Sequence, residues 1–264
     1  MPTVKVNGAE LFYKESGHGP ETIVFSHGFL MDHSMFESQR AAFEGQYRVI
    51  AYDHRGQGQS QDPGHGHDME TLTEDAAALI RELQARPCHF AGLSMGGFVG
   101  IRLAARHPDL VRSLTLMGTG AEKEPLPSRI RYGFLAQLVK LVSPAPFTPI
   151  AQKELFGVTT RNSPAQRSML NEWTAKLRSR PRNIAKSLLG VMNRKGVTGE
   201  LGSIRCPTMV IVGEDDTAQP PRNAERLASG IHGARLVRIP GCGHSSSIEA
   251  PDAVTAAMRE VLQS

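Results

Sequence analysis

Ser94, between two glycines, is the residue of this sequence best placed for covalent chemistry. It lies at the centre of Gly92-Leu93-Ser94-Met95-Gly96. The apolar run 88–93 before it predicts a buried strand, and the run 98–105 after it predicts a helix. A strand, a serine and a helix in this order are typical of a nucleophile elbow, a strained turn that exposes the hydroxyl. The pattern alone fits equally well a turn that merely joins two elements.

A serine nucleophile needs a base, and the base needs an acid that orients it. The strand predicted over 208–212 runs into Gly213-Glu214-Asp215-Asp216, and the strand over 235–239 runs into a loop that contains His244. In a parallel sheet both loops would lie at the edge that carries Ser94. We therefore predict His244 as the general base. Glu214, Asp215 and Asp216 are all candidates for the acid at this point.

Two backbone N–H groups are predicted to hold the negative charge that develops on the substrate oxygen. Met95 follows the serine and supplies one of them. Phe29, in the loop after the strand 22–25, supplies the other. We interpret His27 in the same loop as a structural residue that holds the loop in place. Cys242 is expected to be a small packing residue and not a second nucleophile.

A polar loop offers the one candidate metal site. It contains His65, His67 and Asp68, with Asp62 nearby. We prefer to interpret it as a flexible loop, because the chemistry of a Ser-His-Asp triad requires no metal. We expect neither a metal nor a cofactor in this protein.

The elements that must position these residues alternate between strands and helices. An opening hairpin (3–6 and 10–15) and strands at 22–25, 47–52, 88–93, 111–117, 208–212 and 235–239 predict an α/β fold: a doubly wound, mostly parallel sheet. Residues 121–202 show no convincing strand, and prolines divide them into short helical pieces. We interpret this segment as a helical cap inserted into a core formed by residues 1–120 and 203–264, and expect a minority of its apolar side chains to face the pocket.

Length and composition exclude several classes of protein. A chain of 264 residues suits one large α/β domain with an insertion. The start has no apolar run typical of a signal peptide, and no run approaches the roughly 18 apolar residues that cross a bilayer. The cysteines are Cys88, Cys206 and Cys242, an odd number that favours reduced thiols and a cytoplasmic location. The basic residues carry no recognisable nucleic-acid-reading motif, so we expect no nucleic-acid partner.

Positive charge is concentrated in the predicted cap. Residues 121–200 hold 14 Lys and Arg, five Glu and no Asp, whereas the whole chain has a net charge of +4. This surplus could attract an anionic substrate. The alternative, which we prefer, is a set of solvated helix faces that happen to be basic.

Taken together, these motifs resemble those of the α/β-hydrolase superfamily, over nearly the whole chain. The matching segments are Ser26-His27-Gly28-Phe29, Asp53-His54-Arg55-Gly56-Gln57-Gly58-Gln59-Ser60, Gly92-Leu93-Ser94-Met95-Gly96-Gly97, Gly213-Glu214-Asp215-Asp216 and Gly243-His244. In that superfamily the acid is usually the third residue after such a glycine, which implies Asp216. The resemblance also implies a small-molecule ester or lactone as substrate.

Within the superfamily, the elbow resembles 3-oxoadipate enol-lactonases, and residues 25–30 resemble the serine esterase and non-haem chloroperoxidase group. Ser94 separates the chain from haloalkane dehalogenases and epoxide hydrolases, which have an aspartate there. Leu93 departs from the asparagine that precedes the nucleophile in many carbon–carbon bond hydrolases of aromatic-ring degradation, which weakens that interpretation.

Two functions remain in competition. The first is a hydrolase of carboxylic esters or lactones that works through an acyl-enzyme, with which a peroxide-dependent side reaction of the perhydrolase or chloroperoxidase type is compatible. The second is a slow-turnover ligand receptor or signalling module that keeps the same triad, because a fold does not determine a function. The sequence does not indicate the oligomeric state.

Overall fold

One sheet organises the protein, as a computed structural model that describes residues 2–263 shows. Its eight strands lie in the order β1-β2-β4-β3-β5-β6-β7-β8. β1 pairs antiparallel with β2, and β2 with β4, whereas all further pairs are parallel. The strands are β1 (Thr3–Val6), β2 (Ala9–Ser16), β3 (Thr22–Ser26), β4 (Arg48–Tyr52), β5 (Cys88–Leu93), β6 (Val111–Met117), β7 (Thr208–Gly213) and β8 (Arg235–Ile239).

Helices follow most of the parallel strands, as a doubly wound sheet requires. The α-helices are α1 (Glu37–Phe43), α2 (Met69–Glu82), α3 (Met95–Arg106), α4 (Leu126–Leu141), α5 (Thr148–Leu155), α6 (Val158–Asn162), α7 (Arg167–Arg178), α8 (Ile184–Met192), α9 (Pro221–Gly230), α10 (Ser246–Glu249) and α11 (Pro251–Leu262). Short 3₁₀ helices are η1 (His33–Phe36), η2 (Ala145–Phe147), η3 (Pro164–Gln166) and η4 (Thr198–Ser203).

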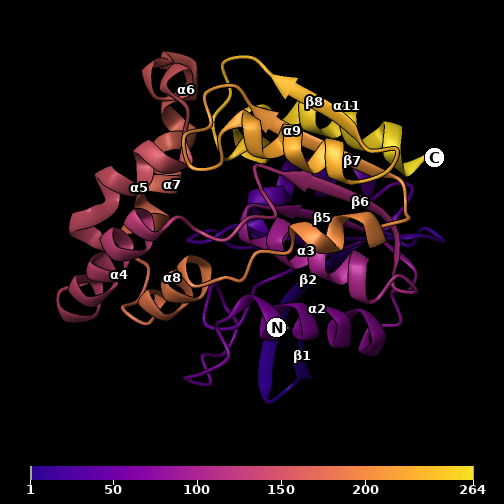
Figure 1. Ribbon diagram of the computed structural model, residues 1–264, viewed down its shortest axis with the longest axis horizontal. Helices are drawn as coiled ribbons and strands as arrows, with labels where there is room; N and C mark the ends of the chain where they lie inside the picture. Colours follow the sequence, from indigo (N-terminus) through magenta and orange to yellow (C-terminus); the bar gives the residue numbers. More distant parts are fainter. Residues whose placement is uncertain (1, 264) are drawn as a thin grey trace.

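Alternation along the strands divides the core into two apolar layers. Val24 and Ile50 pack on the layer formed with α2, α3 and α9. Their neighbours Ile23 and Val49 face the opposite layer, formed with α1 and α11. Helices cover both faces of the sheet (Figure 1). The central strands are therefore buried on both sides. The predicted α/β fold with a doubly wound, mostly parallel sheet is confirmed.

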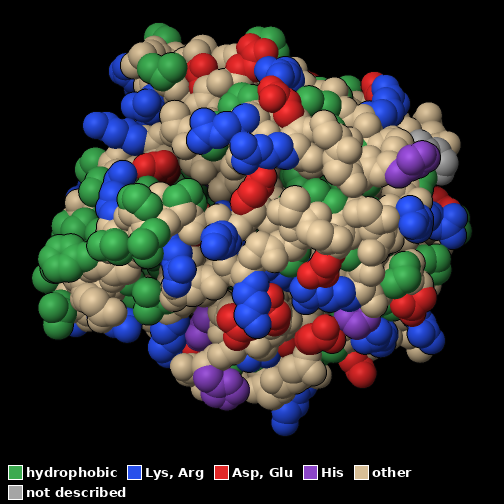
Figure 2. All heavy atoms as spheres, in the orientation of Figure 1, with side chains coloured by type: hydrophobic (Ala, Val, Ile, Leu, Met, Phe, Trp, Pro, Cys, Tyr) green, Lys and Arg blue, Asp and Glu red, His purple; other side chains and the backbone are tan. Residues whose placement is uncertain are grey.

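The segment between β6 and β7 contains only helices. In Figure 1, α4 to α8 gather beside the sheet, away from the C-terminus. Figure 2 shows hydrophobic side chains gathered over the region of α4 and α5, with Lys and Arg side chains around them. We call α4 to α8 the inserted helices; the division into a core and a cap at residues 121 and 202 stays a prediction. Within residues 2–263 no helix is both long and apolar enough to cross a membrane.

Cations of the inserted segment bind acidic residues in the loops after β3 and β4. Arg180 Nη2 lies 2.8 Å from Asp32 Oδ2, and Lys186 Nζ lies 2.9 Å from Asp62 Oδ2. These pairs bridge the two parts of the chain. Part of the positive charge that the sequence concentrates in this segment therefore attaches the inserted helices to these two loops.

Candidate active site

Ser94 occupies a strained turn between β5 and α3. Its backbone φ is +53°, in the left-handed region that non-glycine residues rarely adopt. Its N–H donates to the carbonyl oxygen of Met117 at 2.8 Å, and α3 begins at the next residue. A Cβ on Gly92 would clash with the carbonyl oxygen of Gly96, so only glycine allows the strand and the helix to approach this closely.

His244 is held by a buried carboxylate. Its Nδ1 lies 2.8 Å from Asp216 Oδ2, and both side chains are almost completely buried. Burial disfavours the charged imidazole, but the negative charge of Asp216 and this hydrogen bond outweigh it, so the pKa of His244 is raised. Asp216 Oδ1 also accepts from the N–H of Gln219 at 2.8 Å, which fixes the carboxylate in its orientation.

The two neighbouring acids point elsewhere. Asp215 Oδ2 accepts from the N–H of Thr159 at 3.0 Å, near the start of α6, and the hydrogen bonds from Thr159 lower the pKa of Asp215. Glu214 is exposed. Asp216, the acid that the resemblance implied, is therefore the one of the three that contacts His244.

Glu249 organises the loop that carries His244, and sequence reasoning missed it. Its carboxylate accepts from the N–H groups of Gly243 and Ser245 at 3.0 Å each, and from that of Gly157 at 2.9 Å. The carboxylate therefore joins the histidine loop to the segment between α5 and α6. Burial raises the pKa of Glu249. No motif marks this residue, because most of its partners are backbone groups.

The loop after β3 places Phe29 and Leu30 in the wall of the same pocket as Ser94 and His244. His27 Nδ1 lies 2.8 Å from the carbonyl oxygen of Gly28, and the N–H of His54 donates to His27 Nε2 at 3.0 Å. These partners require a neutral ring protonated on Nδ1, and burial lowers the pKa of His27 accordingly. His27 therefore holds the loop, the structural role expected from the sequence.

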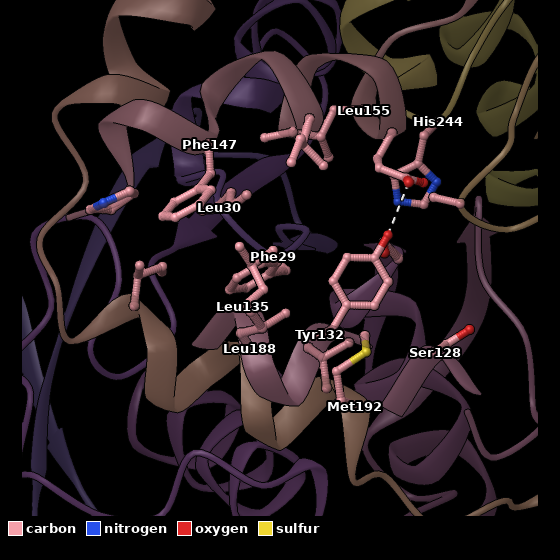
Figure 3. Close-up of a pocket in the computed structure, with 18 of the residues that line it drawn as sticks. Phe29, Leu30, Ser128, Tyr132, Leu135, Phe147, Leu155, Leu188, Met192 and His244 are labelled. Carbon is pink, nitrogen blue, oxygen red and sulfur yellow. Dashed lines mark hydrogen bonds between the residues drawn. The ribbon is translucent and has the colours of Figure 1, made fainter. Parts of the chain in front are cut away.

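The pocket has a volume of about 320 Å³ and lies between the ends of the parallel strands and the inserted helices. Figure 3 shows a cluster of apolar side chains on one side of it, and Tyr132 and His244 on the other. The labelled apolar residues of this cluster are Phe29, Leu30, Leu135, Phe147 and Leu188. The inserted helices therefore supply much of the wall that surrounds Ser94 and His244.

Two glutamates and two arginines add a polar part to the pocket, which the sequence did not indicate. Tyr132 donates to Glu154 Oε1 at 2.9 Å, shown by the dashed line in Figure 3. Burial, and secondarily Glu154, raise the pKa of Tyr132 to about 12, so this hydroxyl stays protonated. Arg131 Nη2 lies 3.7 Å from Glu154 Oε1, and Arg194 Nη1 lies 2.8 Å from Glu124 Oε2. Each arginine thus faces a carboxylate.

The remaining candidates contribute to structure. His67 Nε2 lies 3.0 Å from Asp62 Oδ1, and Asp68 accepts from the N–H of Thr71 as the N-cap of α2. In the described part of the chain no three His, Cys, Asp or Glu residues come together as metal ligands. Cys242 is buried, and this burial raises the pKa of its thiol, which keeps it in the unreactive protonated form.

The sequence and the fold of this chain are similar to those of known proteins. Residues 21–251 match the family described as alpha/beta hydrolase fold. A non-heme haloperoxidase of Rhodococcus erythropolis is 30% identical over the full length of both chains. The enol-lactonase from Burkholderia xenovorans LB400 is 29% identical, with a TM-score of 0.92 over 100% of both chains. A thermophilic esterase from Thermogutta terrifontis is 30% identical, with a TM-score of 0.90 over 99% of this chain and 96% of that one.

Proposed function

Since the chain belongs to the α/β-hydrolase family, as its motifs indicated, we propose that it is a serine hydrolase of carboxylic esters or lactones. One observation carries the proposal. Ser94, on its strained turn, and His244, bound to Asp216, open onto the same largely apolar pocket. A nucleophile, a base and an orienting acid are the parts that acyl transfer requires.

In the proposed mechanism, Ser94 Oγ attacks the substrate carbonyl carbon while His244 Nε2 takes the hydroxyl proton. Asp216 stabilises the imidazolium that forms and keeps the proton of Nδ1 in place. The N–H groups of Phe29 and Met95 hold the oxyanion of the tetrahedral intermediate. The intermediate collapses to an acyl-enzyme as His244 protonates the leaving oxygen. Water, deprotonated by His244, then releases the acid.

A neutral substrate suits this pocket better than an anionic one. The pocket wall contains Arg131 and Arg194, which would have to bind a substrate carboxylate, but each of them already faces a glutamate. Arg194 also donates to the carbonyl oxygens of Glu122 and Val191, at 3.1 and 3.0 Å. We therefore propose that a neutral ester or lactone is preferred and that its acyl group enters the apolar part of the pocket.

The decisive experiment is an activity screen over p-nitrophenyl esters, neutral lactones and a carboxylate-bearing enol-lactone. Ser94→Ala and His244→Ala should each reduce turnover by roughly 10⁴-fold, and the double variant should be little worse, because the residues act as a unit. Additive losses would contradict a shared mechanism. If the pocket is neutral, kcat/KM should favour the uncharged substrates and change little with added salt.

The same screen separates an enzyme from a receptor. Many cycles of p-nitrophenyl acetate hydrolysis per Ser94 indicate an enzyme, whereas a single slow cycle indicates a ligand receptor with a retained triad.

A further inference from the structure

The outer face of α4 carries a row of hydrophobic side chains that extend into solvent. Leu126, Ile130, Phe134 and Leu141 have exposed fractions of 63%, 66%, 68% and 72%. Their spacing of four, four and seven residues places them on one side of a helix. Val142 and Ile150, exposed by 53% and 40%, lie in the segment that follows. We call these six residues the apolar ridge.

The inner face of α4 is already occupied. Ala136 and Val139 are buried against α8, and Tyr132 and Leu135 line the pocket. The helix is thus apolar on two sides, one of which the protein itself covers. A contiguous exposed apolar surface of this kind is typical of an interaction site.

Positive charge surrounds the apolar ridge. Residues 125–153 contain Arg129, Arg131, Lys140 and Lys153 and no Asp or Glu. Among residues 2–263, Arg129, Lys140 and Lys153 have no ion pair, whereas Arg131 Nη2 pairs with Glu154 Oε1 at 3.7 Å. In Figure 2, Lys and Arg side chains, with an acidic one among them, lie beside the gathered hydrophobic side chains. The ridge and its cations therefore form one surface that is both apolar and basic.

We propose that this surface binds peripherally to an anionic lipid surface, with the apolar ridge at the level of the headgroups. Apolar side chains beside lysines and arginines are the combination that lies in a membrane interface. A second copy of the chain is a poorer partner, because a twofold contact through the ridge would bring the unpaired cations Arg129, Lys140 and Lys153 of both copies together. Ile150 belongs both to the ridge and to the pocket wall. A bound lipid surface would therefore lie at the edge of the pocket.

Cosedimentation with vesicles tests the proposal. The intact chain should bind vesicles of phosphatidylcholine that contain phosphatidylglycerol, should bind pure phosphatidylcholine far less, and should dissociate as salt is added. Ile130→Ser combined with Phe134→Ser should weaken binding at least tenfold. Lys140→Gln should weaken it about fivefold, the share of one cation near an anionic surface.

Val158→Ser is the matched control, since Val158 is 52% exposed but lies on α6 outside the ridge. It should bind like the unchanged chain. All variants alter exposed side chains, and equal melting temperatures would show that each is folded. Absence of binding to anionic vesicles, or equal binding by the Ile130/Phe134 variant, would overturn the proposal. So would a concentration-dependent dimer that this variant abolishes, since the ridge would then contact a second copy.

Discussion

At the scale of single residues, the proposed reactivity depends on His244 being neutral. A protonated imidazole cannot accept the proton of Ser94, so turnover must fall as the pH drops through the pKa of His244. Burial alone would lower that pKa, yet the charge of Asp216 and its hydrogen bond raise it above the ordinary value of 6.5. The carboxylate thus moves the working range of the base toward higher pH.

We expect kcat/KM for p-nitrophenyl acetate to rise with pH along a limb whose midpoint lies above 6.5. Asp216→Asn removes the negative charge that raises the pKa, so it should shift the midpoint to lower pH and reduce kcat by about 10⁴-fold. Asp215→Asn serves as the control, because Asp215 binds Thr159 and not His244. This variant should change neither the midpoint of the pH limb nor kcat. A limb centred below 6.5 in the unchanged protein would contradict this view of the histidine.

At the scale of elements, the segment after α7 binds the loop that carries Phe29 through hydrogen bonds. Arg180 Nε donates to the carbonyl oxygen of Leu30 at 2.9 Å, and its Nη2 donates to Asp32 Oδ2 at 2.8 Å. Gln57 Oε1 also accepts from the N–H of Leu30, at 3.2 Å, and Leu30 has a left-handed φ of +67°. A strained backbone persists only where its surroundings hold it. Arg180, between α7 and α8, therefore supports the proposed oxyanion hole.

Arg180→Ala should lower kcat by about 10- to 100-fold with little change in KM, because a small displacement of the oxyanion donor weakens transition-state binding most. Arg180→Lys should recover only part of the loss, since an ammonium does not reproduce the paired geometry of a guanidinium. Arg178→Ala, at the exposed last residue of α7, should leave kcat unchanged. Active-site titration corrects for misfolded protein. An unaltered kcat per titrated site in Arg180→Ala would refute the coupling.

At the scale of the whole molecule, one buried ion pair joins three parts of the fold. Arg55, in the loop after β4, binds Asp75 of α2 through Nε and Nη2 at 2.5 and 2.6 Å. Asp75 also accepts from Asn7 Nδ2 at 3.1 Å, in the turn between β1 and β2. Both charged side chains are 1% exposed. Removing one partner would leave the other charge buried without compensation.

Asp75→Ala should lower the free energy of unfolding by about 3–5 kcal/mol, measured by urea denaturation. Arg238→Ala breaks a pair with Glu225 whose side chains are 45% and 46% exposed, so it should cost below about 1 kcal/mol. Similar losses in the two variants would show that the buried pair has no special role in stability.

The sequence by itself determined what depends on short-range patterns. The alternation of strands and helices, the turn at Ser94 between glycines and the order of the later strand ends follow from the side chains at those positions. They sufficed to predict the sheet and to propose Ser94 and His244, since strand ends of a parallel sheet meet at one edge.

Only the tertiary structure decided which distant groups meet. The side chains of the loop do not distinguish Asp216 from its neighbours; the superfamily resemblance implied Asp216, and the structure shows it in contact with His244 while Asp215 binds Thr159. Glu249 holds a backbone N–H 92 residues away, and Arg180 reaches an aspartate 148 residues away. The sequence indicated a surplus of positive charge in the inserted segment but not that Arg180, Lys186 and Arg194 bind acidic partners. Such pairings depend on how whole elements pack against one another, and no periodicity or turn signal within the chain encodes that packing.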